Sequence, residues 1–233
     1  MSPQYYDPNI DYRRLHKLSE EFTQLWNRLQ ALYLDAVVGF AFVRGHVESD
    51  QAHARSYVQG SELDSEEFQD TRMFTYSQIF SEGFCTSRIH EATQGEVKAR
   101  NALGGANFIT LGQLCLASFY DFWNDYLRRE YVIAKGHLDR GESNDPVVKA
   151  RLREHASYDL WGDLRLLRNS IVHNQGIASS DVAGCKLLRW FKPGDQISIT
   201  PEQMRVIFLA LLKYRNELFE EHLPKTYIRV PSS

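Results

Sequence analysis

The feature that most constrains the fold is a long helical periodicity near the N-terminus. From about Asp11 to Val43 the apolar residues recur at spacings of three and four, which is the pattern of one amphipathic helix. A helix of this kind has an apolar stripe that must pack against other elements. The residues that carry the stripe are Leu15, Leu18, Phe22, Leu25, Trp26, Leu29, Leu32, Tyr33, Ala36, Val37 and Phe40.

The rest of the chain predicts further helices, so we expect a mainly α-helical bundle. Residues 45–63 are polar without a period and are expected to form a loop. Thr93-x-x-Glu96 has the form of a capping box, and Gly104-Gly105 predicts a kink or break. Helices are expected from about Asp64 to Ser81, from about Asn107 to Ala134, in a short segment that Asp145-Pro146 opens, and from Thr200-Pro201 to about Glu221.

One segment predicts β structure. Lys186 to Phe191, then Lys-Pro-Gly-Asp, then Gln196 to Ile199 has the pattern of two short strands joined by a turn. We therefore expect a small β-hairpin annex near residues 186–199. No repeat or long linker divides the chain, which predicts one helical domain over residues 1–233 with flexible tails at 1–10 and 225–233.

Composition limits the classes of function. The three cysteines, Cys85, Cys115 and Cys185, are widely spaced, which favours reduced thiols and a cytoplasmic protein over a disulfide framework. No Cys-x-x-Cys pair predicts zinc, and no Lys-Ser/Thr follows Gly104-Gly105 as a phosphate loop would require, so we expect no metal and no cofactor. No apolar run is long enough to span a membrane.

The segment Leu160 to Gly176 carries the most informative polar residues. Leu160, Leu164, Leu167 and Ile171 fall on one side of a helical wheel and predict a stripe that faces the core. Asn169 and His173 are four residues apart and share another face. Arg168 lies on the far side of that face, and Gly176 is expected to end the helix.

Arg-Asn-Ser-Ile-Val-His at 168–173, with Leu-x-x-Leu-Leu before it and a glycine soon after, resembles the signature of the HEPN superfamily. The resemblance covers roughly Asp159 to Gly176, and the helical layout around it matches loosely. It implies a HEPN-like helical bundle and a metal-independent endoribonuclease, often of bacterial defence or toxin systems. It also implies a site at a dimer interface. Some members carry Tyr two residues after the His, where this chain has Gln175, which puts membership in that toxin–antitoxin subgroup in doubt.

The chemistry of these residue types agrees with RNA cleavage. RNA supplies its own 2′-hydroxyl nucleophile, so a site needs a group that moves protons and a positive charge beside the phosphate. His173 suits the first task as general acid or base, and Arg168 suits the second. Asn169 could orient the imidazole or contact the phosphate. Because one helix supplies one histidine, we expect a homodimer in which two copies share a cleft.

The charge distribution supports the same region. The segment from Lys149 to Lys192 has eight Lys and Arg against four Asp and Glu, whereas the remainder of the chain is acidic. Asp121 or Asp125 could pair with Arg168, but solvated positions on the helix face are the simpler expectation. The aromatic residues Phe119, Tyr120, Phe122, Trp123 and Tyr126 are spaced as core residues of a helix rather than as a base-stacking platform.

Three alternatives stay open. Arg215, Asn216 and His222 repeat the Arg-Asn-to-His pattern on the last helix and could hold the site instead. The chain could also be a non-catalytic interaction or ligand-sensing module with the same fold. A DNA-binding regulator is the third alternative, although no helix-turn-helix pattern supports it and DNA is not the expected partner.

Overall fold

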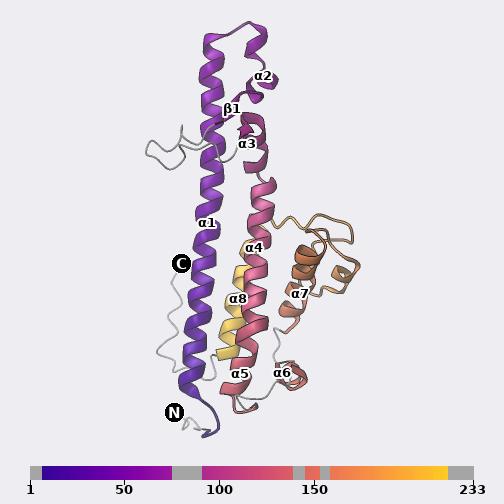
Figure 1. Ribbon diagram of the computed structural model, residues 1–233. Helices are drawn as coiled ribbons and strands as arrows, with labels where there is room; N and C mark the ends of the chain where they lie inside the picture. The colour runs from indigo at the N-terminus through magenta and orange to yellow at the C-terminus, as the bar shows by residue number, and fades with distance from the viewer. Residues whose placement is uncertain (1–6, 75–90, 139–144, 153–157, 220–233) are drawn as a thin grey trace. The chain divides into compact units, whose positions relative to one another are not determined.

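The computed structural model describes residues 7–74, 91–138, 145–152 and 158–219 (Figure 1). The protein is mainly helical and has one small antiparallel sheet among these residues. Three short segments complete it: the 3-10 turns η1 (Glu62–Asp64) and η4 (Ser180–Gly184), and a π-helical turn, η3 (Trp123–Leu127). The helices are α1 (Tyr12–Tyr57), α2 (Glu66–Asp70), α3 (Gln94–Asn101), α4 (Ala106–Phe122), α5 (Arg128–Ala134), α6 (Asp145–Leu152), α7 (Tyr158–His173) and α8 (Pro201–Phe219).

Helix α1 is longer than the periodicity predicts. The expected loop at 45–63 is wrong, because the helix continues to Tyr57. Val47 and Gln51, one turn apart, are both buried, with 1% and 4% of their surface exposed. Arg44 and Glu48 pair across one turn of the exposed face at 2.7 Å. The buried stripe therefore continues, but one of its members is polar and hides the period.

The chain forms two compact units. The first holds Met1–Ala31, Gln113–Ile197 and Pro201–Ser233, and the second holds Leu32–Gly112 and Ser198–Thr200. Of the expected tails, residues 1–6 and 225–233 lie outside the described residues. Residues 7–10 are described, and the Asp11 N–H that follows them donates to the Ala134 carbonyl at 2.8 Å.

Contacts between aromatic rings join the helices of the first unit. Phe208 of α8 places its ring centroid 6.0 Å from that of Trp26 and 5.7 Å from that of Phe119, so α8 packs between the first part of α1 and α4 (Figure 1). Trp161 of α7 stacks on Trp123 with a centroid distance of 4.6 Å. This stack fixes α7 against the π-helical turn, and α7 carries the sequence motif.

The second unit contains the sheet. Strands β1 (Met73–Phe74) and β2 (Ala92–Thr93) are antiparallel, with Met73 opposite Thr93. The helix expected as far as Ser81 is wrong in its first part, because α2 ends at Asp70 and β1 follows. Residues 75–90 lie outside the described residues. The predicted capping box is confirmed: Thr93 and Glu96 bond each other's backbone N–H groups.

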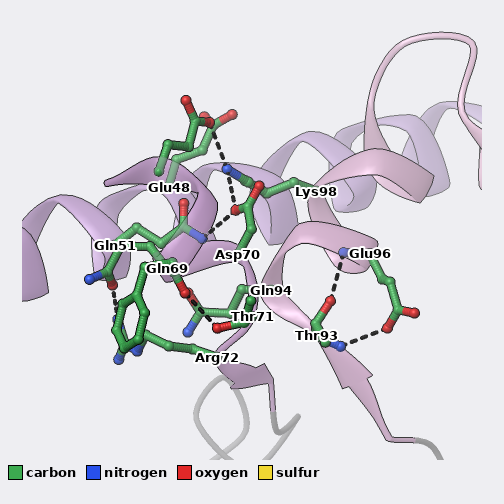
Figure 2. Close-up of polar contacts among 12 residues, drawn as sticks. Glu48, Gln51, Gln69, Asp70, Thr71, Arg72, Thr93, Gln94, Glu96 and Lys98 are labelled. Carbon is green, nitrogen blue, oxygen red and sulfur yellow. Dashed lines mark hydrogen bonds and ion pairs between the residues drawn. The ribbon is translucent and has the colours of Figure 1, made fainter. Parts of the chain in front are cut away.

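A polar network holds the elements of the second unit together (Figure 2). The Asp70 carboxylate accepts a hydrogen bond from Gln51 at 2.8 Å and forms an ion pair with Lys98 at 2.7 Å. Lys98 also reaches Glu66 at 2.9 Å. Asp70 therefore joins α1, α2 and α3.

The prediction of a small antiparallel β element is confirmed, but its strands are β1 and β2. The predicted location at residues 186–199 is wrong. Residues 186–199 form no strand, and the nearest pairing is an isolated bridge between Ile177 and Gln196. The reason is the Asp163 carboxylate, which is 2% exposed. It accepts the backbone N–H groups of Lys186, Leu187 and Leu188 at 2.8, 2.6 and 2.7 Å. Groups that bind a carboxylate cannot also form a β ladder.

No single helix among the described residues is long and apolar enough to cross a membrane. Helix α3 and the helical run from Ala106 to Ala134 meet at a bend. They reach that length and apolar composition only when the two are taken together.

Candidate functional site

Helix α7 places the motif on a surface that faces away from the core. Leu160, Leu164 and Leu167 are buried as predicted, and Ile171 is partly buried. Asn169 and His173 are exposed, and Arg168 is partly buried. The amphipathic pattern therefore predicted correctly which side of the helix presents the polar residues.

Arg168 and His173 are in contact within one chain. Nη1 of Arg168 lies 3.4 Å from Nε2 of His173. A guanidinium has donors only, so as a hydrogen bond this contact requires Nε2 to accept and the ring proton to lie on Nδ1. In that tautomer Nε2 is the ring nitrogen that can take up a proton.

Asp121 of α4 fixes the other side of the guanidinium. Nε of Arg168 lies 3.1 Å from Oδ1 of Asp121. The expectation that Asp121 is a solvated residue of the helix face is wrong, and the alternative of pairing is confirmed for it. Asp125 differs, because it accepts a hydrogen bond from the Asn124 amide at 2.6 Å. Asp121, Arg168 and His173 thus form a chain of polar contacts from α4 to the end of α7.

Asn169 does not join this chain of contacts. Its side chain is exposed, and among the described residues none forms a side-chain hydrogen bond with it. Its predicted role toward the imidazole or a phosphate stays a prediction.

The end of α7 is held by a tight turn. Gln175 and Gly176 both have positive φ, 53° and 78°, and the Gly176 N–H reaches back to the Ser170 and Ile171 carbonyls at 3.2 Å. A Cβ on Gly176 would lie 2.6 Å from Nε2 of Gln113 and 2.8 Å from Nε2 of Gln196. Glycine ends the helix as predicted, and its missing side chain leaves room for the two amides.

Ser170, inside the motif, was not singled out from the sequence. Its side chain is buried, and Oγ accepts the Ser179 N–H at 3.1 Å while donating to the Leu166 carbonyl at 3.1 Å. It therefore anchors the chain that follows the helix. The sequence did contain a signal for this burial. Ser170 comes three residues after the buried Leu167 and lies on the apolar side of the helical wheel.

The competing motif on α8 is only partly described. Arg215 donates to the neighbouring Asn216 side chain at 3.0 Å, and His222 lies outside the described residues. The described residues therefore show no contact in this motif that corresponds to the one between Arg168 and His173.

The described cysteines are poor candidates for nucleophiles. Cys115 and Cys185 are free and buried. Burial raises the pKa of each thiol to about 11, and the charge of Asp163 adds to the effect at Cys185. Both are protonated near neutral pH, where only a thiolate would react.

Two described clefts lie away from the motif. One has a volume of about 560 Å³ and lies between the start of α1 and α5, lined by Arg13, Arg14, Lys17 and Arg129 among others. A second, of about 480 Å³, lies nearby along α1 and includes Arg28 and Tyr126. Arg168 and His173 line neither of these two clefts; His173 is exposed and Arg168 is partly buried.

Comparison with protein families, with curated proteins and with solved structures finds no match to the chain.

Proposed function

We propose that the protein is a metal-independent endoribonuclease of the HEPN type. The observation that carries the proposal is the 3.4 Å contact between the Arg168 guanidinium and the His173 imidazole on an exposed helix face. Cleavage of RNA through its own 2′-hydroxyl needs these two groups and no bound cofactor. Asp121 supports the proposal because it holds the guanidinium beside the ring.

In the proposed reaction, His173 takes the proton of the 2′-hydroxyl through Nε2 as that oxygen attacks the adjacent phosphorus. Arg168 turns its donors to the phosphate oxygens, whose negative charge grows in the transition state. The 5′-oxygen leaves with a proton, and the product ends in a 2′,3′-cyclic phosphate. A second copy of the chain supplies the imidazole that gives this proton, so the working form is a homodimer with a shared cleft.

The test uses purified protein, single-stranded RNA labelled at its 5′ end, and EDTA. We expect products with 2′,3′-cyclic phosphate ends. His173→Ala should lower the cleavage rate by about 10²–10⁴-fold and Arg168→Ala by about 10²–10³-fold. His53→Ala and Arg44→Ala, exposed positions on α1, are matched controls and should cleave as the wild type does.

The competing proposal, a non-catalytic interaction module, has its own outcome. Intact RNA after incubation with folded wild-type protein would favour it and contradict the nuclease. Cleavage that survives both α7 variants and disappears with His222→Ala would move the site to the Arg215, Asn216 and His222 motif. Expression in bacteria adds a physiological measurement: wild type should arrest growth, as a defence or toxin nuclease would, and the Arg168→Ala, His173→Ala double variant should not.

A further inference from the structure

A basic cleft lies where the start of α1 meets α5, within the first compact unit (Figure 1). Its volume of about 560 Å³ falls in the range of small-molecule sites, about 300–1,000 Å³. Both helices contribute cations to its lining. The charged lining residues are the cations Arg13, Arg14, Lys17 and Arg129 and the acids Asp11 and Glu130.

Both acids of this cleft are bound to Arg14. Oε2 of Glu130 accepts hydrogen bonds from Nη2 and Nε of Arg14 at 2.8 and 3.2 Å. Oδ1 of Asp11 accepts the backbone N–H of Arg14 at 2.9 Å. The acids keep their negative charge, so the four cations leave the lining with two positive charges in excess. A dianion would balance this excess.

Arg13 is the cation best placed to bind that dianion. Its side chain is exposed, and within the described part of the chain it forms no hydrogen bond or ion pair. Lys17 follows one turn later on the same side of α1, where its ammonium group lies 3.7 Å from Glu21. The positive end of the α1 dipole lies beside Arg13 as well. An arginine fork can donate to two oxygens of one phosphate.

A second cleft, of about 480 Å³, continues the first along α1. Nη2 of Arg14, in the first cleft, donates to the Tyr126 hydroxyl at 2.7 Å. That hydroxyl donates to Oε2 of Glu21 at 2.7 Å. Tyr126 and Glu21 both line the second cleft, so the two clefts meet at this chain of hydrogen bonds.

Part of the aromatic cluster that the sequence predicts as core lines the second cleft. Phe119 and Trp123 are buried as predicted, but Tyr120, Phe122 and Tyr126 are only partly buried. The prediction is therefore wrong for these three residues. Two of them, Phe122 and Tyr126, line the second cleft.

The second cleft differs from the first in its chemistry. The ring centroids of Phe122 and Tyr126 lie 5.5 Å apart, and Leu25 adds an aliphatic side chain to the lining. Arg28 and Glu21 are its charged residues and balance each other. A flat apolar group therefore suits this cleft better than a second charged group does.

We infer that the two clefts together bind a phosphate monoester whose organic part is flat and apolar. The first cleft takes the phosphate, with Arg13 as the main donor and Lys17 and Arg129 beside it. The second cleft takes the organic part, against Phe122 and Tyr126. Arg168 and His173 line neither cleft, so the inference does not depend on the proposed nuclease.

The test is isothermal titration calorimetry of the purified full chain at low salt. The probe is methylumbelliferyl phosphate, which has a flat ring system and is a dianion above neutral pH. Two further ligands divide its chemistry: inorganic phosphate lacks the ring, and methylumbelliferyl sulfate has the ring with a single charge. The phosphate ester should bind once per chain, about tenfold or more tighter than either.

Variants assign the binding to the clefts. Arg13→Ala should weaken binding of the ester and of inorganic phosphate by about tenfold, because each loses a charged donor. Arg205→Ala is the matched control, since Arg205 is an exposed arginine of α8 that lines neither cleft. Leu25→Ala should weaken binding of the ester and leave that of inorganic phosphate unchanged. Arg13 is exposed and the three ligands need no variant, so both remain informative if Leu25→Ala fails to fold.

Four outcomes would overturn the inference. The first is no heat of binding from the ester at millimolar concentration. The second is a dissociation constant for Arg13→Ala equal to that of the wild type. The third is equal affinity for the ester, its sulfate analogue and inorganic phosphate, which would leave the second cleft without a role. The fourth is binding that is lost in Arg168→Ala and kept in Arg13→Ala, which would place the ligand at the α7 motif.

Discussion

Arg168 is useful to a phosphate only if its guanidinium is already turned toward the site. Without a contact to hold it, the Arg168 side chain would sample many rotamers. The entropy lost on ordering the side chain would then weaken its binding to the phosphate. Asp121 limits this freedom through one contact at 3.1 Å, with both side chains partly exposed. In the proposed reaction the acid therefore acts through the arginine, as a positioning residue.

The first prediction follows from that contact. Asp121→Asn should reduce the cleavage rate by roughly 1.4- to fivefold, because a partly exposed ion pair is worth about 0.2–1 kcal/mol. The single variant Arg168→Lys should lower the cleavage rate more than Asp121→Asn does, since lysine lacks the planar fork of donors. The measurement is kcat and KM on labelled RNA, with Asp125→Asn as the neighbouring control. A rate for Asp121→Asn equal to the wild type would show that Arg168 needs no anchor.

Gly176 gives a second prediction at this scale. Alanine at φ 78° is strained, and its methyl group would press on the Gln113 and Gln196 amides. Gly176→Ala should lower the free energy of unfolding by about 1–3 kcal/mol, measured by denaturant titration. Gly162→Ala, inside α7 with open space around its Cβ, should not destabilise the protein. Equal effects of the two changes would rule out the strain at Gly176.

At the scale of elements, one carboxylate shapes the segment after α7. Asp163 is buried and satisfies three consecutive N–H groups, so the chain from Lys186 to Leu188 binds α7 instead of pairing as a strand. Asp163→Asn replaces one acceptor oxygen by a donor group and removes the charge. It should cost about 2–4 kcal/mol and lower Tm by roughly 5–15 °C.

Asp159→Asn is the control for this change. Its ion pair with Lys186 at 2.7 Å is exposed, so the cost should stay within about 1 kcal/mol. Hydrogen exchange locates the effect: the amides of 186–188 should lose protection in Asp163→Asn. Protection equal to the wild type would mean that the carboxylate is not what holds them.

These elements show where sequence patterns suffice and where they fail. The capping box at Thr93, the proline start of α8 and the stripe of α7 were predictable because each depends on residues a few positions apart. The segment 186–199 was not, because its partner, Asp163, is more than twenty residues away and alternation alone cannot reveal a carboxylate acceptor. The end of α1 was missed because a buried glutamine interrupts the apolar period.

The polar network of the second unit predicts a pH dependence. Burial would raise the pKa of Asp70, but the hydrogen bonds from Lys98 and Gln51 outweigh it and lower the pKa below its usual value. A carboxyl with a lowered pKa stabilises the folded state above its unfolded pKa, and this stabilisation is lost as pH falls through the folded value. We therefore expect the amides of α3 to lose protection from exchange below about pH 4.

Lys98→Met tests the cause. Without the ammonium group the pKa of Asp70 should rise toward its unfolded value, so the amides of α3 should be less protected near neutral pH and should lose less protection than in the wild type as pH falls below about 4. Lys17→Met removes an exposed lysine of the first unit and should leave the profile of α3 unchanged. Identical profiles for wild type and Lys98→Met would show that Lys98 does not set the pKa of Asp70.

For the whole molecule, the sequence located the candidate site but could not assemble it. Arg168, His173 and their shared helix were evident from spacing. The contact of Arg168 with Asp121 depends on how α7 packs against α4 and η3, to which the stack of Trp161 on Trp123 contributes. Residues forty or more positions apart carry no local period that would reveal such packing.

The last prediction concerns association of two copies. The motif face holds one imidazole, and Val172, which lies between Arg168 and His173 on the helical wheel, is 51% exposed. If this face meets its copy about a two-fold axis, Val172 contributes apolar area and the two histidines share a cleft. Val172→Glu should then place like charges at the contact and yield a monomer, measured by analytical ultracentrifugation, with cleavage lowered by about 10²-fold.

Val206→Glu, at an exposed valine of α8, is the matched control and should keep both association and activity. Cleavage by monomeric Val172→Glu at the wild-type rate per chain would show that one imidazole suffices, because no second copy would be present to give the leaving oxygen its proton.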